Sequence, residues 1–232
     1  MKGANLFYDL FAVFFPRTCA ACETTLLKHE RVICSYCEFN LPRTGFHLEE
    51  ENAVSAAFWG RAIINRAAAF YYFNKGNKVQ TMIHKLKYKG RKDVGMRIGE
   101  IYGKELAKAP SFSSADLIIP VPLHPKRQRK RGYNQSECFA NGLALSMNAK
   151  VNTTALIRTV ASQTQTKKSR MSRWDNVSEI FEVKRPEELA GKNILLVDDV
   201  MTTGATLEAC AMRILTVPGT KICIATIACA IK

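Results

Sequence analysis

The sequence has no apolar run long enough to cross a bilayer, no internal repeat and no low-complexity tract. The apolar run nearest the N-terminus, Leu6–Phe15, is interrupted by Asp9 and is about half as long as the roughly 20 residues that a spanning helix needs. The residues that follow it, Pro16 to Cys19, make a poor cleavage site for a signal peptide. We expect this run to form a short amphipathic helix against the module behind it, in a cytoplasmic protein.

Acidic residues are scarce relative to basic ones. The chain has 20 Asp and Glu against 34 Lys and Arg among 232 residues, for a formal net charge of +14. Hydrophobic residues make up 47% of it, which predicts a packed globular core and excludes a disordered chain. A surface this basic favours phosphate-bearing partners such as nucleic acid, nucleotides or anionic lipid, although a merely solvated basic face has the same composition.

Half of the eight cysteines fall into two close pairs. Cys19 and Cys22 form one C-x₂-C turn, Cys34 and Cys37 form the other, and eleven residues separate them. Two such turns supply the four thiolates that tetrahedral Zn²⁺ prefers, and four protein ligands leave no open position for catalysis. We therefore predict a structural zinc knuckle. The other cysteines lie in apolar surroundings, which indicates buried free thiols in a reducing compartment; they are Cys138, Cys210, Cys223 and Cys229.

Apolar strands and helical patterns alternate over the rest of the chain. This alternation predicts an α/β fold with a parallel sheet covered on both faces. We expect an N-terminal helix and zinc knuckle over residues 1–45 and the α/β domain over 46–232. The predicted strands are 66–73, 117–121, 153–158, 193–197 and 222–231; the predicted helical segments are 78–109, about 135–147, and one starting near 205.

The most informative segment is the one that follows the apolar strand 193–197. Asp198 and Asp199 end this strand, and a hydroxyl-rich turn from Thr202 to Thr206 leads into a helix. Amides at a helix start and threonine hydroxyls suit a phosphate, whereas the two acids suit ribose hydroxyls or a hydrated Mg²⁺. A response-regulator receiver domain also places two acids after such a strand, but the 33 residues after Asp199 are too few for the rest of that domain.

A strongly basic segment follows the predicted strand 117–121. Prolines stiffen its entry, and five of the six residues from Lys126 to Arg131 are cations. We expect a long loop that binds anions at the ligand edge of the sheet. A solvated charge run and a nucleic-acid patch are the alternatives.

These motifs resemble known families. The segment 194–207 resembles the phosphate loop of type I phosphoribosyltransferases. The cysteine pairs, the segment HKLKYKG at 84–90 and the segment RGYNQ at 131–135 extend the resemblance to the ComF family of competence proteins, which join a zinc knuckle to a phosphoribosyltransferase-like domain.

The resemblance implies binding of 5-phosphoribosyl 1-pyrophosphate (PRPP) with Mg²⁺. It places Asp198 and Asp199 on the ribose hydroxyls, and Lys126, Arg127 and Arg131 on the pyrophosphate. The residues that it places on the 5′-phosphate are Thr202, Thr203, Gly204, Ala205 and Thr206. It also implies that a flexible loop over 164–176 closes on the ligand.

Several functions are compatible with these patterns. One is a PRPP-binding protein that serves DNA uptake and transformation, with single-stranded DNA and the competence machinery as partners and with Mg²⁺-dependent phosphoribosyl (pentosyl) transfer as an added activity. Another is a metabolic phosphoribosyltransferase in nucleotide salvage or of amidophosphoribosyltransferase type. A third is a nucleic-acid protein with a vestigial ribosyl fold. No His or Glu stands out as a general base, and no segment identifies an acceptor.

Smaller expectations concern the aromatic and lysine side chains. Tyr71, Tyr72 and Tyr133 are candidates for stacking on bases, although aromatic side chains are more often buried in the core. Lys85, Lys87 and Lys89 either line the ligand mouth or are simply exposed.

Overall fold

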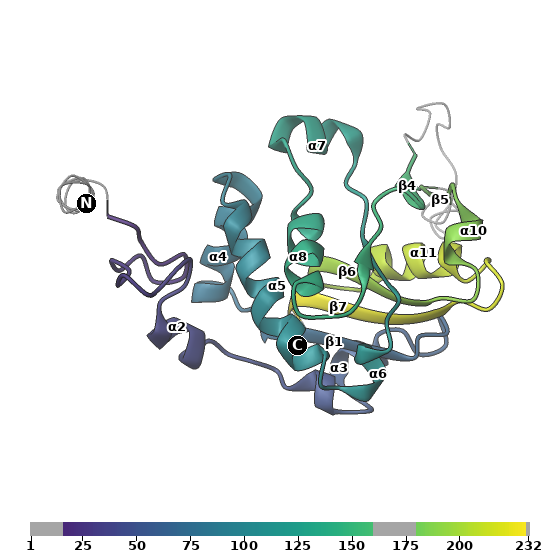
Figure 1. Ribbon diagram of the computed structural model, residues 1–232, viewed down its shortest axis with the longest axis horizontal. Coiled ribbons are helices and arrows are strands. Elements are labelled where there is room, and N and C mark those ends of the chain that lie inside the picture. The colour runs from purple at the N-terminus through teal and green to yellow at the C-terminus, as the bar shows by residue number, and fades with distance from the viewer. Residues whose placement is uncertain (1–15, 160–179, 231–232) are drawn as a thin grey trace, which may run out of the picture.

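The computed structural model describes residues 16–159 and 180–230. Its centre is a parallel sheet in the order β1-β7-β6-β2-β3 (Figure 1). These strands span Arg66–Tyr72 (β1), Leu117–Pro120 (β2), Lys150–Val151 (β3), Asn193–Met201 (β6) and Lys221–Cys229 (β7). Every residue from Ile194 to Val197 is buried, so both faces of β6 are covered, as the continuous apolar run predicts. The expected helix over 6–15 and the expected loop over 164–176 lie outside the described residues.

The helices connect and cover these strands. Helix α8 packs on β2 and β6, and α11 packs on β6. The helical elements are α2 (Ser35–Asn40), η1 (Phe46–Leu48), α3 (Ala53–Ala56), α4 (Lys78–Tyr88), α5 (Lys92–Leu106), α6 (Pro110–Ser113), α7 (Pro125–Arg131), α8 (Gln135–Ala144), α10 (Pro186–Leu189) and α11 (Ala205–Ile214). Within the described ranges, no helix is long and apolar enough to cross a membrane.

Two sequence expectations about these elements need correction. The helical segment 78–109 is two helices, because the chain turns at Gly90, whose φ is +70°, a conformation that favours glycine. The long basic loop is instead helix α7. His124 caps its start by accepting from the amide of Lys126, and Gly132, with φ of +80°, ends it. Proline at the first helical position and glycine just past the last favour such a short helix.

Helices α5 and α8 are the most closely packed pair of helices among the described residues, and glycines allow this close contact. A Cβ placed at Gly99 of α5 would lie 2.8 Å from the Cα of Gly142 and 2.8 Å from the amide nitrogen of Leu143 in α8. These are backbone atoms, so neither helix can yield without moving as a whole. The packing fixes α8, whose first turn reaches the candidate site described below.

We expect Gly99→Ala to lower the free energy of unfolding by about 2–3 kcal/mol, because the added methyl overpacks this contact. Urea unfolding measures it. Lys104→Ala, on the exposed face of the same helix, is the control and should change stability by less than about 0.5 kcal/mol. Equal effects of the two substitutions would contradict the close-packing explanation.

The predicted strand 153–158 does not join the main sheet. Only its last three residues form a strand, β4 (Leu156–Arg158), which pairs antiparallel with β5 (Phe181–Val183) in a separate two-stranded sheet. This small sheet lies beside α11 (Figure 1). Next to this pair the amide of Thr159 donates to the carbonyl of Ile180 over 2.8 Å; the residues between these two lie outside the described part of the chain.

The segment that follows the cysteine pairs is hydrogen-bonded to the edge of the main sheet. The amide of Tyr72 donates to the carbonyl of Pro42, and the amide of Thr44 donates to the carbonyl of Phe70, so the segment 42–44 pairs with the edge strand β1. An ion pair of 2.8 Å between Glu38 of α2 and Arg97 of α5 adds a second connection. The domain limits 1–45 and 46–232 stay a prediction.

The connections of β2 and β6 define a crevice. From β2 the chain passes through α7 and α8 to β3 on one side, whereas from β6 it passes through α11 to β7 on the other. Since β2 and β6 are neighbours, their carboxyl ends form a topological switch point, where open α/β sheets bind ligands.

Candidate phosphoribosyl site

Two carboxylates lie at the carboxyl end of β6, beside this crevice. Asp199 is buried, at 4% exposed, and Asp198 is partly buried. The hydroxyl of Ser136, in the first turn of α8, donates to Asp198 Oδ1 over 2.7 Å, and the amide of Asp199 donates to the same oxygen over 2.8 Å. Asn134 holds the start of α8 by donating to the carbonyl of Val121 over 2.9 Å. The ends of β2, β6 and α8 therefore meet at the acid pair.

This arrangement is unfavourable for the charge of Asp198. Burial, and then repulsion from Asp199, raises the pKa of Asp198 from 3.8 to about 7, although the Ser136 hydroxyl and the Asp199 amide oppose the shift. A carboxyl perturbed in this way in a crevice is typical of a functional site. Because the pKa of Asp198 differs between the folded and unfolded chain, the free energy of unfolding also depends on pH.

We expect Asp198→Asn to raise the free energy of unfolding by about 1–3 kcal/mol at pH 8 in the absence of ligand. Because the pKa of Asp198 is raised in the folded state, the wild-type protein loses stability as the pH rises from about 4 to about 7. The asparagine amide does not ionise, and it keeps an oxygen that accepts from Ser136. Urea unfolding at pH 5 and pH 8 should show the larger gain at pH 8. An equal loss of stability at both values would contradict this explanation.

The threonine turn lies beside the acids and is open to solvent. Thr202, Thr203, Ala205 and Thr206 are exposed, and Gly204 between them is buried. Gly204 has φ of +79°, and a Cβ there would lie 3.3 Å from the ring of Phe58. Gly204 has no side chain to cap α11, which begins at Ala205, and the amide of Ala205 makes only a long contact of 3.5 Å to the Thr203 hydroxyl. Such amides, with adjacent hydroxyls, can hold a phosphate.

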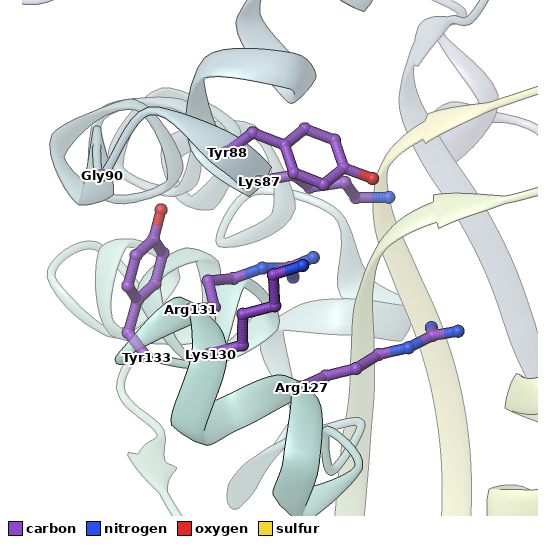
Figure 2. A pocket seen from close by; sticks show the side chains of 7 residues that line it. All are labelled: Lys87, Tyr88, Gly90, Arg127, Lys130, Arg131 and Tyr133. Atoms are coloured by element: carbon purple, nitrogen blue, oxygen red, sulfur yellow. The ribbon is translucent and has the colours of Figure 1, made fainter.

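A basic pocket of about 450 Å³ lies between α4 and α7. Figure 2 shows four cationic side chains from the two helices pointing their charged ends to the same side. Arg131 lies 5.7 Å from the ring of Tyr88. The residues that line the pocket are Lys87, Tyr88, Gly90, Arg127, Lys130, Arg131 and Tyr133.

Of the predicted pyrophosphate cations, the structure places Arg127 and Arg131 in this pocket, whereas Lys126 is exposed on α7 and does not line it. The prediction that Tyr71 stacks on bases is wrong, because its side chain is fully buried in the core. Tyr72 is 37% exposed. Tyr133 lines the basic pocket and donates its hydroxyl to the carbonyl of Leu86.

Lys87 is a site residue that the sequence left undecided. Its ammonium lies 3.0 Å from Asp199 Oδ2, and it also lines the basic pocket. Lys85 instead pairs with Glu23 in the cysteine module over 3.0 Å, and Lys89 is exposed. Lys85 and Lys87 of α4 thus contact different parts of the molecule, and the basic composition of this segment alone does not distinguish them.

Arg158 is a second residue that the sequence did not mark. It ends β4, its guanidinium lies 5.3 Å from the ring of Phe181, and its Nε is buried without a hydrogen-bond partner in the described structure. Burial and then the positive charge of Arg127 lower the pKa of Arg158, whereas Asp198 raises it. The side chain is therefore a further cation within electrostatic range of Arg127 on α7 and of Asp198.

The four N-terminal cysteines form one cluster. The sulfur atoms of Cys19, Cys22, Cys34 and Cys37 all lie within 4.8 Å of one another, and tetrahedral Zn–S bonds of about 2.3 Å imply S···S separations of about 3.8 Å. The amide of Cys34 also donates to Cys19 Sγ over 3.3 Å, a contact that stabilises a metal-bound thiolate. The donor set therefore fits a zinc ion with no open position.

Comparison with known proteins agrees with this geometry. The phosphoribosyl transferase domain matches residues 134–230. The chain is 27% identical over 201 residues to the DNA utilization protein YhgH of Escherichia coli, which covers 85% of this chain and 83% of that protein. It is 36% identical over 100 residues to the competence protein ComFC of Bacillus subtilis, which covers 43% of this chain and 38% of ComFC.

Among solved structures, the chain is similar to the glutamine PRPP amidotransferase from B. subtilis, with a TM-score of 0.43 and 20% identity. That match covers 62% of this chain and 30% of the amidotransferase. The domain match and the two named relatives confirm the resemblance to the ComF family. With the parallel sheet and the four-cysteine cluster, they also confirm the predicted fold class.

Proposed function

We propose that this ComF-like chain binds PRPP with Mg²⁺ at the crevice between β2 and β6, and that it serves DNA uptake and handling in the cytoplasm during natural transformation. The observation that carries the proposal is the acid pair Asp198–Asp199, which lies at the switch point with an uncapped helix start on one side and the basic pocket on the other. The two relatives named for DNA utilization and competence support the biological setting.

Each part of PRPP has a counterpart in this arrangement. Asp198 and Asp199 would accept from the vicinal ribose hydroxyls, because ionised carboxylates only accept. The amides and hydroxyls of the segment 202–206 would hold the 5′-phosphate. Arg127 and Arg131 would bind the pyrophosphate, assisted by Lys126 from the exposed side of α7, and Mg²⁺, when bound, would neutralise part of its charge. The cysteine cluster would hold a structural Zn²⁺ and take no part in this chemistry.

If the chain transfers the ribosyl group, a nitrogen nucleophile forms a bond to C1 of PRPP while the C1–O bond breaks and pyrophosphate leaves with the bonding electrons. The described residues then act by positioning and by charge: the acids fix the ribose, and the cations stabilise the leaving anion. The proton of the nucleophile would pass to solvent, because no His or Glu is among the described residues that line the pocket.

A metabolic phosphoribosyltransferase is the second candidate function. The domain match over 134–230 supports it, since that match covers the acids and the threonine turn, although the residues that line the basic pocket precede it. A screen for pyrophosphate release from PRPP and Mg²⁺, with a panel of nucleobases, amines and glutamine, separates the two functions. Turnover with one acceptor favours the metabolic enzyme. Saturable PRPP binding without turnover on any acceptor favours a binding role in DNA handling.

The DNA-handling role has a separate test. Single-stranded DNA should bind with an affinity that falls steeply as salt rises, because the cations release counterions from phosphates. An Arg127→Ala, Arg131→Ala double variant should bind more weakly and with a shallower salt dependence. The control is a Lys192→Ala, Lys221→Ala double variant, which removes the same charge. Both lysines lie at the amino ends of β6 and β7, away from the crevice at the carboxyl ends. Equal losses in the two double variants would count against α7 as the DNA site.

A further inference from the structure

Lys87 connects the two halves of the proposed ligand site. Its ammonium lies 3.0 Å from Asp199 Oδ2, and both side chains are largely removed from solvent, at 24% and 5% exposed. Asp199 Oδ2 is buried without a hydrogen bond in the described structure, so the ion pair with Lys87 is what offsets the burial of this carboxylate. The pairing fixes Asp199 in the free chain.

The same ammonium also faces the basic pocket. Lys87 lines this pocket with Arg127, Lys130 and Arg131, and Figure 2 shows its charged end on the same side as theirs. A lysine ammonium has three donors on a flexible four-carbon stem. It can therefore turn from Asp199 toward an anion in the pocket without any movement of α4.

The two positions of this ammonium exclude each other. Contact with Asp199 occupies an oxygen that a ribose hydroxyl would need, whereas an anion in the pocket competes for the same ammonium. On the basis of the proposed PRPP function, we propose that Lys87 is an exchangeable counter-ion and a specificity residue: it holds Asp199 in the free chain and moves to the pyrophosphate when PRPP binds.

This exchange favours intact PRPP over ribose 5-phosphate. When PRPP separates Lys87 from Asp199, it gives each of them a new partner: its ribose hydroxyls donate to Asp199, and its pyrophosphate accepts from the Lys87 ammonium. Ribose 5-phosphate offers the hydroxyls but no pyrophosphate, so Lys87 would leave Asp199 without gaining a new anion. The preference for PRPP thus depends on one lysine of α4.

Calorimetric titration of Lys87→Gln with both ligands, each with Mg²⁺, tests the proposal. Glutamine keeps an N–H donor for Asp199 but has no charge to offer the pyrophosphate. We expect the affinity for PRPP to fall about tenfold to a hundredfold, as for a lost hydrogen bond to a charged group, and the affinity for ribose 5-phosphate to be unchanged or higher. Lys87→Arg keeps the cation and should retain the preference for PRPP.

Lys78→Gln is the matched control. Lys78 begins the same helix and lies 5.2 Å from the ring of Tyr36, so its loss removes one charge away from the pocket and should leave both affinities unchanged. Equal weakening of both ligands by Lys87→Gln, or no change in either, would overturn the proposal; so would loss of the PRPP preference in Lys87→Arg. Failure of the wild-type chain to bind PRPP would instead refute the proposed function.

Discussion

An Asp198→Asn, Asp199→Asn double variant should bind PRPP with Mg²⁺ at least a hundredfold more weakly than the wild type. Hydrogen bonds to charged groups contribute about 1.5–3 kcal/mol each, and the variant loses two carboxylates that we place on the ribose hydroxyls. Asparagine has nearly the same shape, so the loss reflects charge and hydrogen bonding more than packing. Isothermal titration calorimetry measures the difference.

The control for this variant is Asp116→Asn. Asp116 accepts from the amide of Asn193 over 2.8 Å, at the opposite end of β6 from the acid pair. The same chemical change there should leave PRPP affinity unaltered. Wild-type affinity in the double variant would place the ribosyl group elsewhere.

Loss of the zinc ligands should have the second large effect, on folding. Cys37 is fully buried within the cysteine cluster. In small zinc modules, the binding of a structural Zn²⁺ contributes about 10–16 kcal/mol to the free energy of folding. We expect Cys37→Ser to lose the metal and to unfold the segment 17–41. Metal analysis should give one zinc per wild-type chain and much less in the variant, and hydrogen exchange should show fast exchange confined to this segment.

Cys138→Ser is the matched control for the zinc prediction. Cys138 is a partly buried free thiol on α8, and burial raises its pKa, so it is an inert thiol outside the cluster. It should keep one zinc per chain and a protected 17–41 segment. A purified wild-type chain without zinc, or a Cys37→Ser chain with a full equivalent, would contradict the assignment.

The Asp198 carboxylate is expected to have opposite effects on stability and on binding: it lowers the free energy of unfolding of the free chain, and it raises the affinity for PRPP. The carboxyl lowers the stability of the free chain at neutral pH because burial raises its pKa to about 7, yet the ligand needs its charge. Residues that destabilise a fold but bind a ligand are typical of functional sites. A residue that served only the packing of β6 would not show this opposition.

The sequence predicts the main features of the fold for physical reasons that can be traced to particular residues. The run Ile194–Val197 is buried on both faces, so its apolar continuity indicated a central strand, and the carboxyl ends of parallel strands indicated the place of Asp198 and Asp199. The two C-x₂-C turns likewise identified their cluster, because local spacing alone brings each pair together.

Other features depend on tertiary structure that local patterns do not contain. Helix α7 has no buried residue, so it lacks the apolar period that marks a helix, and only its capping residues indicate it. Lys87 reaches Asp199 from a helix far away in the sequence, and Arg158 lies near Arg127 through the small β4–β5 sheet. Their positions depend on the packing of α4 on α5 and of β5 on α11.

The central claim is that the acid pair and the threonine turn bind PRPP. The most direct test is a calorimetric titration of PRPP into the wild-type chain, once with Mg²⁺ and once with a chelator that leaves the zinc cluster loaded. We expect saturable binding at one site per chain with Mg²⁺ and much weaker binding without it. No detectable binding of PRPP by folded, zinc-loaded protein in the presence of Mg²⁺ would contradict the account.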